Sequence, residues 1–450
     1  MNPQGERWTA DQVLALAPDA ASRTAGGRLA VPGSWSGTGA RPDAVWGECA
    51  GSGSRSYQAA ADLADPNRPG YRCGCPSRKV PCKHVLGLLL LWAAGEEAVP
   101  PADEPPPWAG EWLDKRRRRS EPPPGEGTSA SSSAAADRRA AARAGRIADG
   151  VAELERRLAD MVHGGLATSG GGERALWDRT AARMVDAQAP GLASRVRELG
   201  TLPGSGPDWA SRLLEECALL HTLNRAYARV DRLPPGLAAT VRTRVGISVD
   251  AATVLASAKP VRDDWLVLSQ YDDVGDTLTT RRIWLHGGRT GRTALVLSYG
   301  AGGRAPELSL PAGLSLDADL AFHPAAVPLR AALGARYGAP APGAEPPRGT
   351  GVEAALAAYG TALRDDPWLD AWPVVLDGVI PVPDAEHGWQ LADADGGAAL
   401  AVDARHADDT GLWRLMAVSA GGPVRVFGEC GHRGFAPLAF WGPDLMPLRE

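Results

Sequence analysis

Four side chains that commonly bind metals lie within twelve residues of the chain, in the stretch CGCPSRKVPCKH. They are Cys73, Cys75, Cys82 and His84, in the pattern C-x-C, six residues, then C-x-H. Three thiolates and one imidazole make a complete tetrahedral ligand set for zinc, and soft sulfur ligands favour zinc over hard cations. The sequence therefore predicts one bound Zn²⁺.

The flanking residues indicate what the ion does. Gly74 lets the backbone turn tightly between the first two cysteines at a strand end, and a helical pattern begins just after Cys82. A metal here ties the strand end to the helix start and closes a ββα unit that is too small to be stable alone. One segment fills all the coordination positions, whereas a catalytic zinc keeps one open. We therefore expect a structural ion.

The remaining cysteines, of six in total, are Cys49, Cys217 and Cys430, which lie far apart in the sequence. This usage predicts no disulfide framework and fits a reducing cytosol, where clustered cysteines usually bind metal. Cys49 is expected to pack on a strand and Cys217 in a helical core. Cys430 and His432 repeat the C-x-H spacing without a nearby C-x-C, so we expect strand-end and turn residues there.

Length and charge narrow the function classes. A chain of 450 residues predicts two or three domains. A net charge of −5 argues against a chain that coats nucleic acid through its overall field, so such contact needs a local basic patch. The longest apolar run, 85–94, has about ten residues, whereas a membrane span needs about 20. No signal-peptide pattern is visible, and we expect a cytoplasmic protein without membrane contact.

Residues 1–95 are predicted to form one zinc-finger module with N-terminal helices and a hairpin. Thr9 and Gln12 make a capping-box pattern ahead of a first helix. A second helix is expected to end at Gly26 and Gly27, because adjacent glycines are typical of helix ends.

The hairpin is the clearest strand signal in this module. The sequence GSGS separates two alternating segments, which predicts strands at about 44–49 and 56–63. A third extended piece at 69–72 leads into the cysteines, and a helix is predicted from 84 to about 94.

Residues 96–136 are rich in Pro, Glu, Ser and Gly and are predicted to be a disordered linker. Trp108 and Trp112 are an exception, because their spacing places both on one face of a short helix that docks elsewhere. The run KRRRR at 115–119 is interpreted as solvated linker or as a tether to nucleic acid or an acidic partner.

The rest of the chain changes its hydrophobic period once. Residues 137–245 repeat apolar positions every three to four residues and are predicted to be helical. From 246 to 450 the period approaches two, which predicts antiparallel strands in one or two sub-domains, 246–345 and 346–450. The expected fold class is α+β multidomain: a small ββα-type zinc finger, a helical middle region and an antiparallel β-rich C-terminal region.

The four ligands and their flanks resemble the SWIM zinc finger, whose pattern is C-x-C-x(n)-C-x-H. VWGECAGSGSRSYQ corresponds to its preceding hairpin and CPSRKVPCKHVLGLLLL to its loop and helix. The order of finger, helical region and β-rich region is also similar to bacterial SWIM-finger proteins. The resemblance implies DNA binding or protein–protein contacts. It also implies a protein partner from a system of MoxR-type AAA+ ATPases and von Willebrand A-domain proteins.

Basic residues surround the ligands, with Arg72, Arg78, Lys79 and Lys83 as candidate contacts to nucleic acid or a partner. A Cys₃His zinc centre carries about −1 formally, so these cations first offset that charge. The positive charge that is left can bind phosphate groups or can simply be solvated by water, and the sequence leaves both interpretations open.

No pattern in the sequence positions a nucleophile against a base. Walker A, G-x-S-x-G and H-E-x-x-H patterns are absent, and no G-x-G-x-x-G joins a strand to a helix. We therefore expect a non-enzymatic adaptor or scaffold that uses its finger to bind a protein. The alternative is DNA binding through the finger and the 115–119 run.

Overall fold

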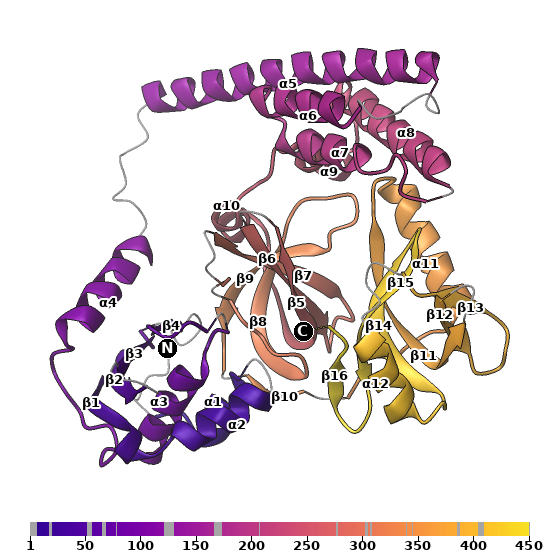
Figure 1. Ribbon diagram of the computed structural model, residues 1–450. Coiled ribbons are helices and arrows are strands. Elements are labelled where there is room, and N and C mark those ends of the chain that lie inside the picture. The colour runs from indigo at the N-terminus through magenta and orange to yellow at the C-terminus, as the bar shows by residue number, and fades with distance from the viewer. Residues whose placement is uncertain are drawn as a thin grey trace.

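The computed structural model describes residues 7–449 apart from 18–19, 52–55, 65–68, 78, 121–129, 166–172, 207, 276–277, 302–304, 307, 339, 344, 385–387 and 404–408 (Figure 1). The N-terminal module lies at the lower left of Figure 1, helices cross the top, and two sheets stand side by side below them. This arrangement confirms the predicted α+β multidomain class, with a finger region, a helical middle and a β-rich C-terminal region.

The N-terminal module is built on a four-stranded antiparallel sheet in the order β1-β2-β3-β4. The strands are β1 (Trp35–Arg41), β2 (Ala44–Ala50), β3 (Ser56–Asp62) and β4 (Gly70–Cys73). Strands β2 and β3 are the predicted hairpin and β4 is the predicted third extended piece. The predicted helix after the cysteines is α3 (Lys83–Ala94), which is buried from His84 to Trp92 because it is apolar on all sides.

Two short helices pack on α3. Helix α1 (Ala10–Ala15) begins with the predicted capping box, in which Thr9 and Gln12 each bond the other's backbone N–H. Helix α2 (Ala20–Leu29) runs through Gly26 and Gly27, so the predicted helix end was wrong. A Cβ on Gly26 would lie 2.8 Å from the Cβ of Leu86. The glycine is needed there for close helix packing rather than for a C-cap.

The segment after α3 returns to the same sheet. The backbone of Ala40 on β1 accepts from Ala102 and donates to Pro100, at 2.8 and 3.0 Å, which covers that sheet edge. Residues 107–120 then form α4 (Pro107–Ser120), which packs on the sheet face opposite α3. The prediction of a disordered linker was therefore wrong for this stretch, and residues 121–129 lie outside the described part of the chain.

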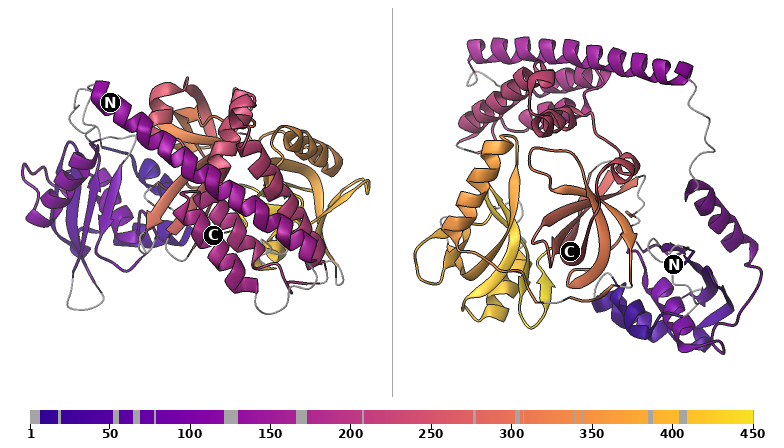
Figure 2. Two further views of the ribbon diagram at one scale, coloured as in Figure 1. Left: turned by 90° about the horizontal axis from the view of Figure 1, so that it is seen from above. Right: turned by 180° about the vertical axis from the view of Figure 1, so that it is seen from behind.

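In its described part, the middle region has five larger helices around one core. They are α5 (Ala130–Gly164), α6 (Glu173–Asp186), α7 (Pro190–Leu199), α8 (Trp209–Tyr227) and α9 (Pro235–Val245). Seen from above, α5 is the long helix that crosses the others (Figure 2). None of the helices in the described residues is both long and apolar enough to cross a membrane.

A short helix, α10 (Ala251–Ser257), leads into a six-stranded sheet in the order β10-β8-β5-β6-β7-β9. A further pairing of β8 with β9 closes it into a barrel, and the pair β7·β9 is parallel. The strands are β5 (Val261–Val274), β6 (Leu278–Gly287), β7 (Thr293–Ala301), β8 (Leu314–Phe322), β9 (Arg330–Arg336) and β10 (Ala341–Pro342).

The last sheet is antiparallel, in the order β13-β12-β11-β14-β15-β16, and packs against α11 (Val352–Asp365) and α12 (Asp409–Ser419). Its strands are β11 (Ala371–Asp384), β12 (Gly388–Asp393), β13 (Ala399–Ala401), β14 (Val424–Gly431), β15 (Gly434–Trp441) and β16 (Leu445–Pro447).

Buried contacts join these units. Glu429 on β14 accepts hydrogen bonds from Tyr271 and Trp284 on the barrel, at 3.0 and 2.7 Å, inside an apolar cluster shared by both sheets. Trp368 packs into the core of the middle helices and donates to the Leu219 carbonyl at 2.9 Å. The C-terminal sheet is therefore held by both the barrel and the helices.

Candidate metal centre

The four predicted ligands converge at one point of the N-terminal module. Cys73 ends β4, Cys75 follows in the turn, Cys82 is the N-cap of α3, and His84 lies in its first turn. Their ligand atoms all lie within 4.8 Å of one another. Cys82 and His84 are buried, and the other two are half-buried.

The donor set fits a zinc ion. With Zn–S bonds of about 2.3 Å, a tetrahedral centre holds its sulfur atoms about 3.8 Å apart. The observed spread needs only a small inward movement to reach that geometry. The chain therefore presents a Cys₃His group positioned to bind one zinc ion, with all four ligands supplied by residues 73–84.

Backbone pairing holds the ligand segments in place. Cys73 lies opposite Ala59 in the β3–β4 ladder, and the N–H of Gly74 donates to the Gln58 carbonyl at 3.0 Å. The carbonyl of Cys82 accepts from the N–H of Leu86 at 3.0 Å, which starts α3. The C-x-C pair thus belongs to the sheet and the C-x-H pair to the helix, so an ion between them joins the two elements.

The protonation of the thiols shows what the ion contributes. The hydrogen bond from the Cys73 thiol, helped by His84 and the Val85 backbone, lowers the pKa of Cys82 to about 4 against the effect of burial. The same bond to Cys82, and then burial, raise the pKa of Cys73, and burial raises that of Cys75. Only one thiolate is favoured without a cation, so a +2 ion is needed to deprotonate the others, and zinc uptake releases protons.

Tyr57 is a neighbour of the site that the sequence did not reveal. Its ring lies on the imidazole of His84, with centroids 4.8 Å apart and planes 33° apart. It limits the rotation of the imidazole, while Nδ1 of His84 lies 3.7 Å from Sγ of Cys73. Tyr57 is opposite Cys49 in the β2–β3 ladder, so only the strand register could have located it.

The other cysteines are buried: Cys49 and Cys217 pack as predicted, and Cys430 lies near the end of β14, as predicted. Cys49 on β2 and Cys430 on β14 are both 0% exposed, and Cys217 lies in the core of the middle helices. His432 is an exposed residue of the turn after β14. Among the described residues, the only group of this kind arranged to hold a metal ion is the one at residues 73–84.

The basic residues near the centre fall into two groups. Arg72 donates to the carbonyl of Trp108 at 2.8 Å, so it binds α4 and is partly buried. Lys79 and Lys83 are exposed, and Arg78 lies outside the described residues. Of the predicted contact residues that are described, two therefore lie on the surface and one joins the finger to α4.

The run KRRRR belongs to α4, and two of its members are used inside the module. Arg116 pairs with the buried Asp62 of β3 at 3.1 Å, and Arg117 pairs with Asp43 at 2.5 Å. Gly70 makes the first pair possible, because a Cβ there would lie 2.4 Å from Nε of Arg116. This part of the run is a clamp between α4 and the sheet rather than the solvated linker or tether that was predicted.

Apolar packing completes the attachment of α4. Ala109 and Leu113 are buried against Trp46 and Ala60 of the sheet. Trp108 and Trp112 pack at the edge of this cluster, which confirms the predicted docking of a short helix. The sheet of the metal module is therefore covered on both faces, by α3 and by α4.

Removal of the arginine clamp should loosen α4. Arg116→Met keeps most of the apolar stem but leaves buried Asp62 without this partner, which we expect to cost about 1–2 kcal/mol of local stability. Because local opening exposes the 115–119 run, trypsin should cut there about tenfold faster. Arg118→Met removes one trypsin site at an exposed position and is the matched control. Equal cleavage rates in the two variants would show that the clamp does not hold the helix.

Comparison with known protein families agrees with this geometry. Residues 69–93 match the SWIM zinc finger, and residues 142–245 match the SWIM-associated four-helix bundle domain. No curated protein and no solved structure matches the chain. The C-x-C-x6-C-x-H ligands lie inside the first match, and helices α6 to α9 with most of α5 lie inside the second. The chain thus contains a SWIM zinc finger that is followed by a SWIM-associated four-helix bundle domain.

Proposed function

We propose that the protein is a non-enzymatic cytoplasmic adaptor, in which the SWIM finger module is the binding surface for a protein partner. The observation that supports it is the internal use of the module's arginines. Arg72, Arg116 and Arg117 bond to groups of the same module, and are therefore occupied rather than presented to a phosphate backbone. Binding to a protein partner does not require a row of exposed cations, whereas binding to a phosphate backbone does.

The site itself supports a role in architecture rather than chemistry. Four protein ligands complete the coordination of one zinc ion, which leaves no position for a substrate. The partner class is taken from the SWIM resemblance. MoxR-type AAA+ ATPases and von Willebrand A-domain proteins are the first partners to test.

DNA binding through the finger is the second candidate function. Lys79 and Lys83 are exposed beside the metal centre, and Lys115 and Arg118 are exposed on α4. These side chains are a smaller basic surface than the sequence suggested, but a few phosphate contacts give measurable affinity at low salt.

One pair of measurements separates the two functions. We expect labelled duplex DNA to show no saturable binding to the full chain in fluorescence anisotropy at about 50 mM salt, where phosphate contacts are strongest. If DNA is the ligand, affinity instead falls about tenfold between about 50 and 200 mM salt for two phosphate contacts. In that case the double variant Lys79→Glu, Lys83→Glu should also bind DNA more weakly than the unchanged protein at the same salt concentration.

The partner is tested with the same variant. Quantitative mass spectrometry after a pull-down should show a protein that the full chain retains and that Lys79→Glu, Lys83→Glu loses. The matched control is Arg232→Glu, Lys259→Glu, which makes the same charge change at exposed positions outside the finger. A partner set that is identical for all three proteins contradicts a role for the finger in binding.

A further inference from the structure

One loop of the C-terminal unit, which runs from α11 to β16, inserts into the four-helix bundle domain. In Figure 1 this unit, drawn in orange and yellow, reaches the bundle at its upper end. The loop is residues 366–370, between α11 and β11, and is called the latch below. Among the described members of the buried bundle core, Trp368 is the one that comes from outside residues 147–245. The bundle core thus reaches the C-terminal unit through a single side chain.

The latch is shaped by its own unit rather than by the bundle. The hydroxyl of Tyr359 on α11 donates to the carbonyls of Leu369 and Asp370, at 3.0 and 3.3 Å. The carboxylate of Asp366 accepts the N–H of Trp368 at 3.1 Å, and Leu369 packs against the core of the C-terminal unit. Trp368 and Leu369 therefore belong to different cores. These bonds remain in place when Trp368 leaves the bundle, so the latch keeps its shape.

Charged side chains surround the inserted tryptophan. Arg244 of α9 pairs with Asp366 at 3.2 Å and with Asp370 at 3.3 Å. Arg195 of α7 pairs with Asp370 at 3.6 Å. The side chain of Asp370 is 74% exposed, so water and salt screen its pairs. A buried aromatic side chain inside a polar rim is typical of interfaces between proteins, and contacts between domains resemble the transient ones.

The barrel holds both units independently of the latch. The N–H of Ala326, in the connection between β8 and β9, donates to the hydroxyl of Thr240 on α9 at 2.9 Å. The barrel also binds the C-terminal unit, through the hydrogen bonds that Glu429 accepts. Opening of the latch therefore separates the bundle from the C-terminal unit at one edge, and both stay attached to the barrel.

We infer that the latch is releasable: Trp368 leaves the bundle and returns while both units stay folded. The ion pairs of Arg244 hold the latch closed, and their loss shifts it toward the open state. In the closed state the indole N–H donates to the carbonyl of Leu219 on α8 at 2.9 Å. The open state exposes that face of α8 together with the indole, so the two states differ in an apolar surface that other molecules can reach.

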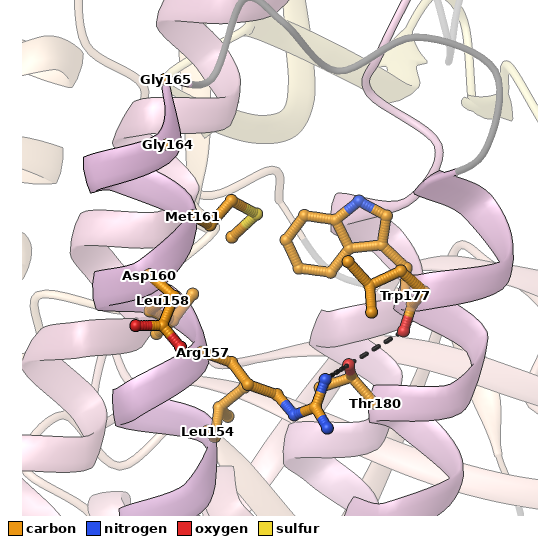
Figure 3. Close-up of a pocket in the computed structure, with 10 residues that line it drawn as sticks. Leu154, Arg157, Leu158, Asp160, Met161, Gly164, Gly165, Trp177 and Thr180 are labelled. Carbon is orange, nitrogen blue, oxygen red and sulfur yellow. Dashed lines mark hydrogen bonds between the residues drawn. The ribbon is translucent and has the colours of Figure 1, made fainter.

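Oxidation of Trp368 by hydroxyl radicals, mapped by mass spectrometry on the full chain, measures the opening. Trp177 is the reference for the bundle, because it is 4% exposed against 3% for Trp368 and lies in the same core. It lines a pocket of about 340 Å³ between α5 and α6, away from the latch (Figure 3). Phe440, which is 0% exposed, is the reference for the core of the C-terminal unit.

Salt should open the latch in the unchanged protein. A rise from about 50 to about 500 mM salt screens the pairs of Arg244 and Arg195, and should at least double the oxidation rate of Trp368 relative to Trp177. The ratio of Phe440 to Trp177 oxidation should stay constant, because both residues lie in cores that remain folded.

Arg244→Glu should open the latch at low salt. Its carboxylate replaces attraction to Asp366 and Asp370 by repulsion, so Trp368 should be oxidised about tenfold faster than in the wild type. Arg242→Glu is the matched control. It makes the same charge change on the same helix, where Arg242 pairs with Asp231 inside the bundle region at 2.8 Å, and should leave Trp368 unchanged.

Three results would overturn the inference. Equal oxidation of Trp368 in Arg244→Glu and Arg242→Glu shows that the ion pairs do not hold the latch. Oxidation of Trp368 that rises only together with that of Trp177 or Phe440 shows that the contact opens by unfolding. If Arg244→Glu does not fold, the salt series of the wild type decides, and a constant ratio of Trp368 to Trp177 oxidation shows a permanent contact.

Discussion

Cys82→Ser is expected to lower the zinc content from about one ion per chain to near zero and to unfold the finger module. Zinc binding contributes about 10–16 kcal/mol in small zinc-finger peptides, which is as large as the whole stability of a typical domain, about 5–15 kcal/mol. A hydroxyl in place of the thiolate of Cys82 removes a soft ligand at the start of α3. Elemental analysis measures the zinc, and limited proteolysis followed by mass spectrometry maps the unfolded residues.

In Cys82→Ser we also expect a definite boundary between cleaved and protected segments. Cleavage should extend through α4, because that helix packs on the sheet of the finger and not on the bundle. The bundle domain and the two β-rich units, which have separate cores, should stay protected.

Cys49→Ser is the matched control, because Cys49 is also a buried thiol of this module but is not one of the four ligands. It should keep one zinc ion per chain and lose only the modest stability of a thiol replaced by a buried hydroxyl. Full zinc occupancy in purified Cys82→Ser protein would contradict the ligand assignment.

The sequence was sufficient for the metal centre because all its ligands are local. Cys73 to His84 lie in one short segment, and the hairpin before them has a strong turn signal. The same reasoning missed Tyr57. Its ring reaches His84 because its strand, β3, pairs with β4 and accepts a hydrogen bond from the N–H of Gly74 in the ligand turn. Contacts across a sheet depend on register, which local patterns do not give.

The role of α4 could not be predicted from composition. Residues 96–136 are polar and Pro-rich as a whole. Within them, Ala109 and Leu113 form a small apolar face, which is enough to bind α4 to the sheet of the finger module. Arg116 and Arg117 looked like surplus charge because their partners, Asp62 and Asp43, lie more than fifty residues earlier. Long-range ion pairs of this kind become visible only once the chain is folded.

The glycines illustrate the same limit. Adjacent glycines predict a helix end, and Gly26 instead lies where α2 crosses α3 too closely for any side chain. Local propensity gave the wrong answer because tertiary packing overrides it when a neighbouring helix requires the space.

Asp263→Ala is expected to destabilise the barrel by about 3–5 kcal/mol, since it leaves several buried donors unpaired. Asp263 is fully buried on β5, and its carboxylate accepts backbone N–H groups of Asp264, Arg289 and Thr290 at 2.8, 3.0 and 2.8 Å. It thereby holds the turn between β6 and β7. Differential scanning calorimetry of the full chain should show the transition of the barrel shifted to lower temperature, with that of the finger module unchanged.

The stability that the Asp263 carboxylate contributes should depend on pH in a definite direction. Burial alone would raise the pKa of the Asp263 carboxyl, but the hydrogen bonds from Thr290 and the backbone of Arg289 outweigh it and lower the pKa. A depressed pKa in the folded state means that this stabilisation is complete above the unfolded value of about 3.9 and is lost as pH falls through the folded value. The stability difference between the wild type and Asp263→Ala should therefore be constant near neutral pH and shrink below about pH 4.

The matched control is Asp264→Ala. It changes a neighbouring carboxylate that is 64% exposed and should lower the free energy of unfolding by less than about 0.5 kcal/mol. If both variants behave alike, the buried carboxylate does not organise the turn.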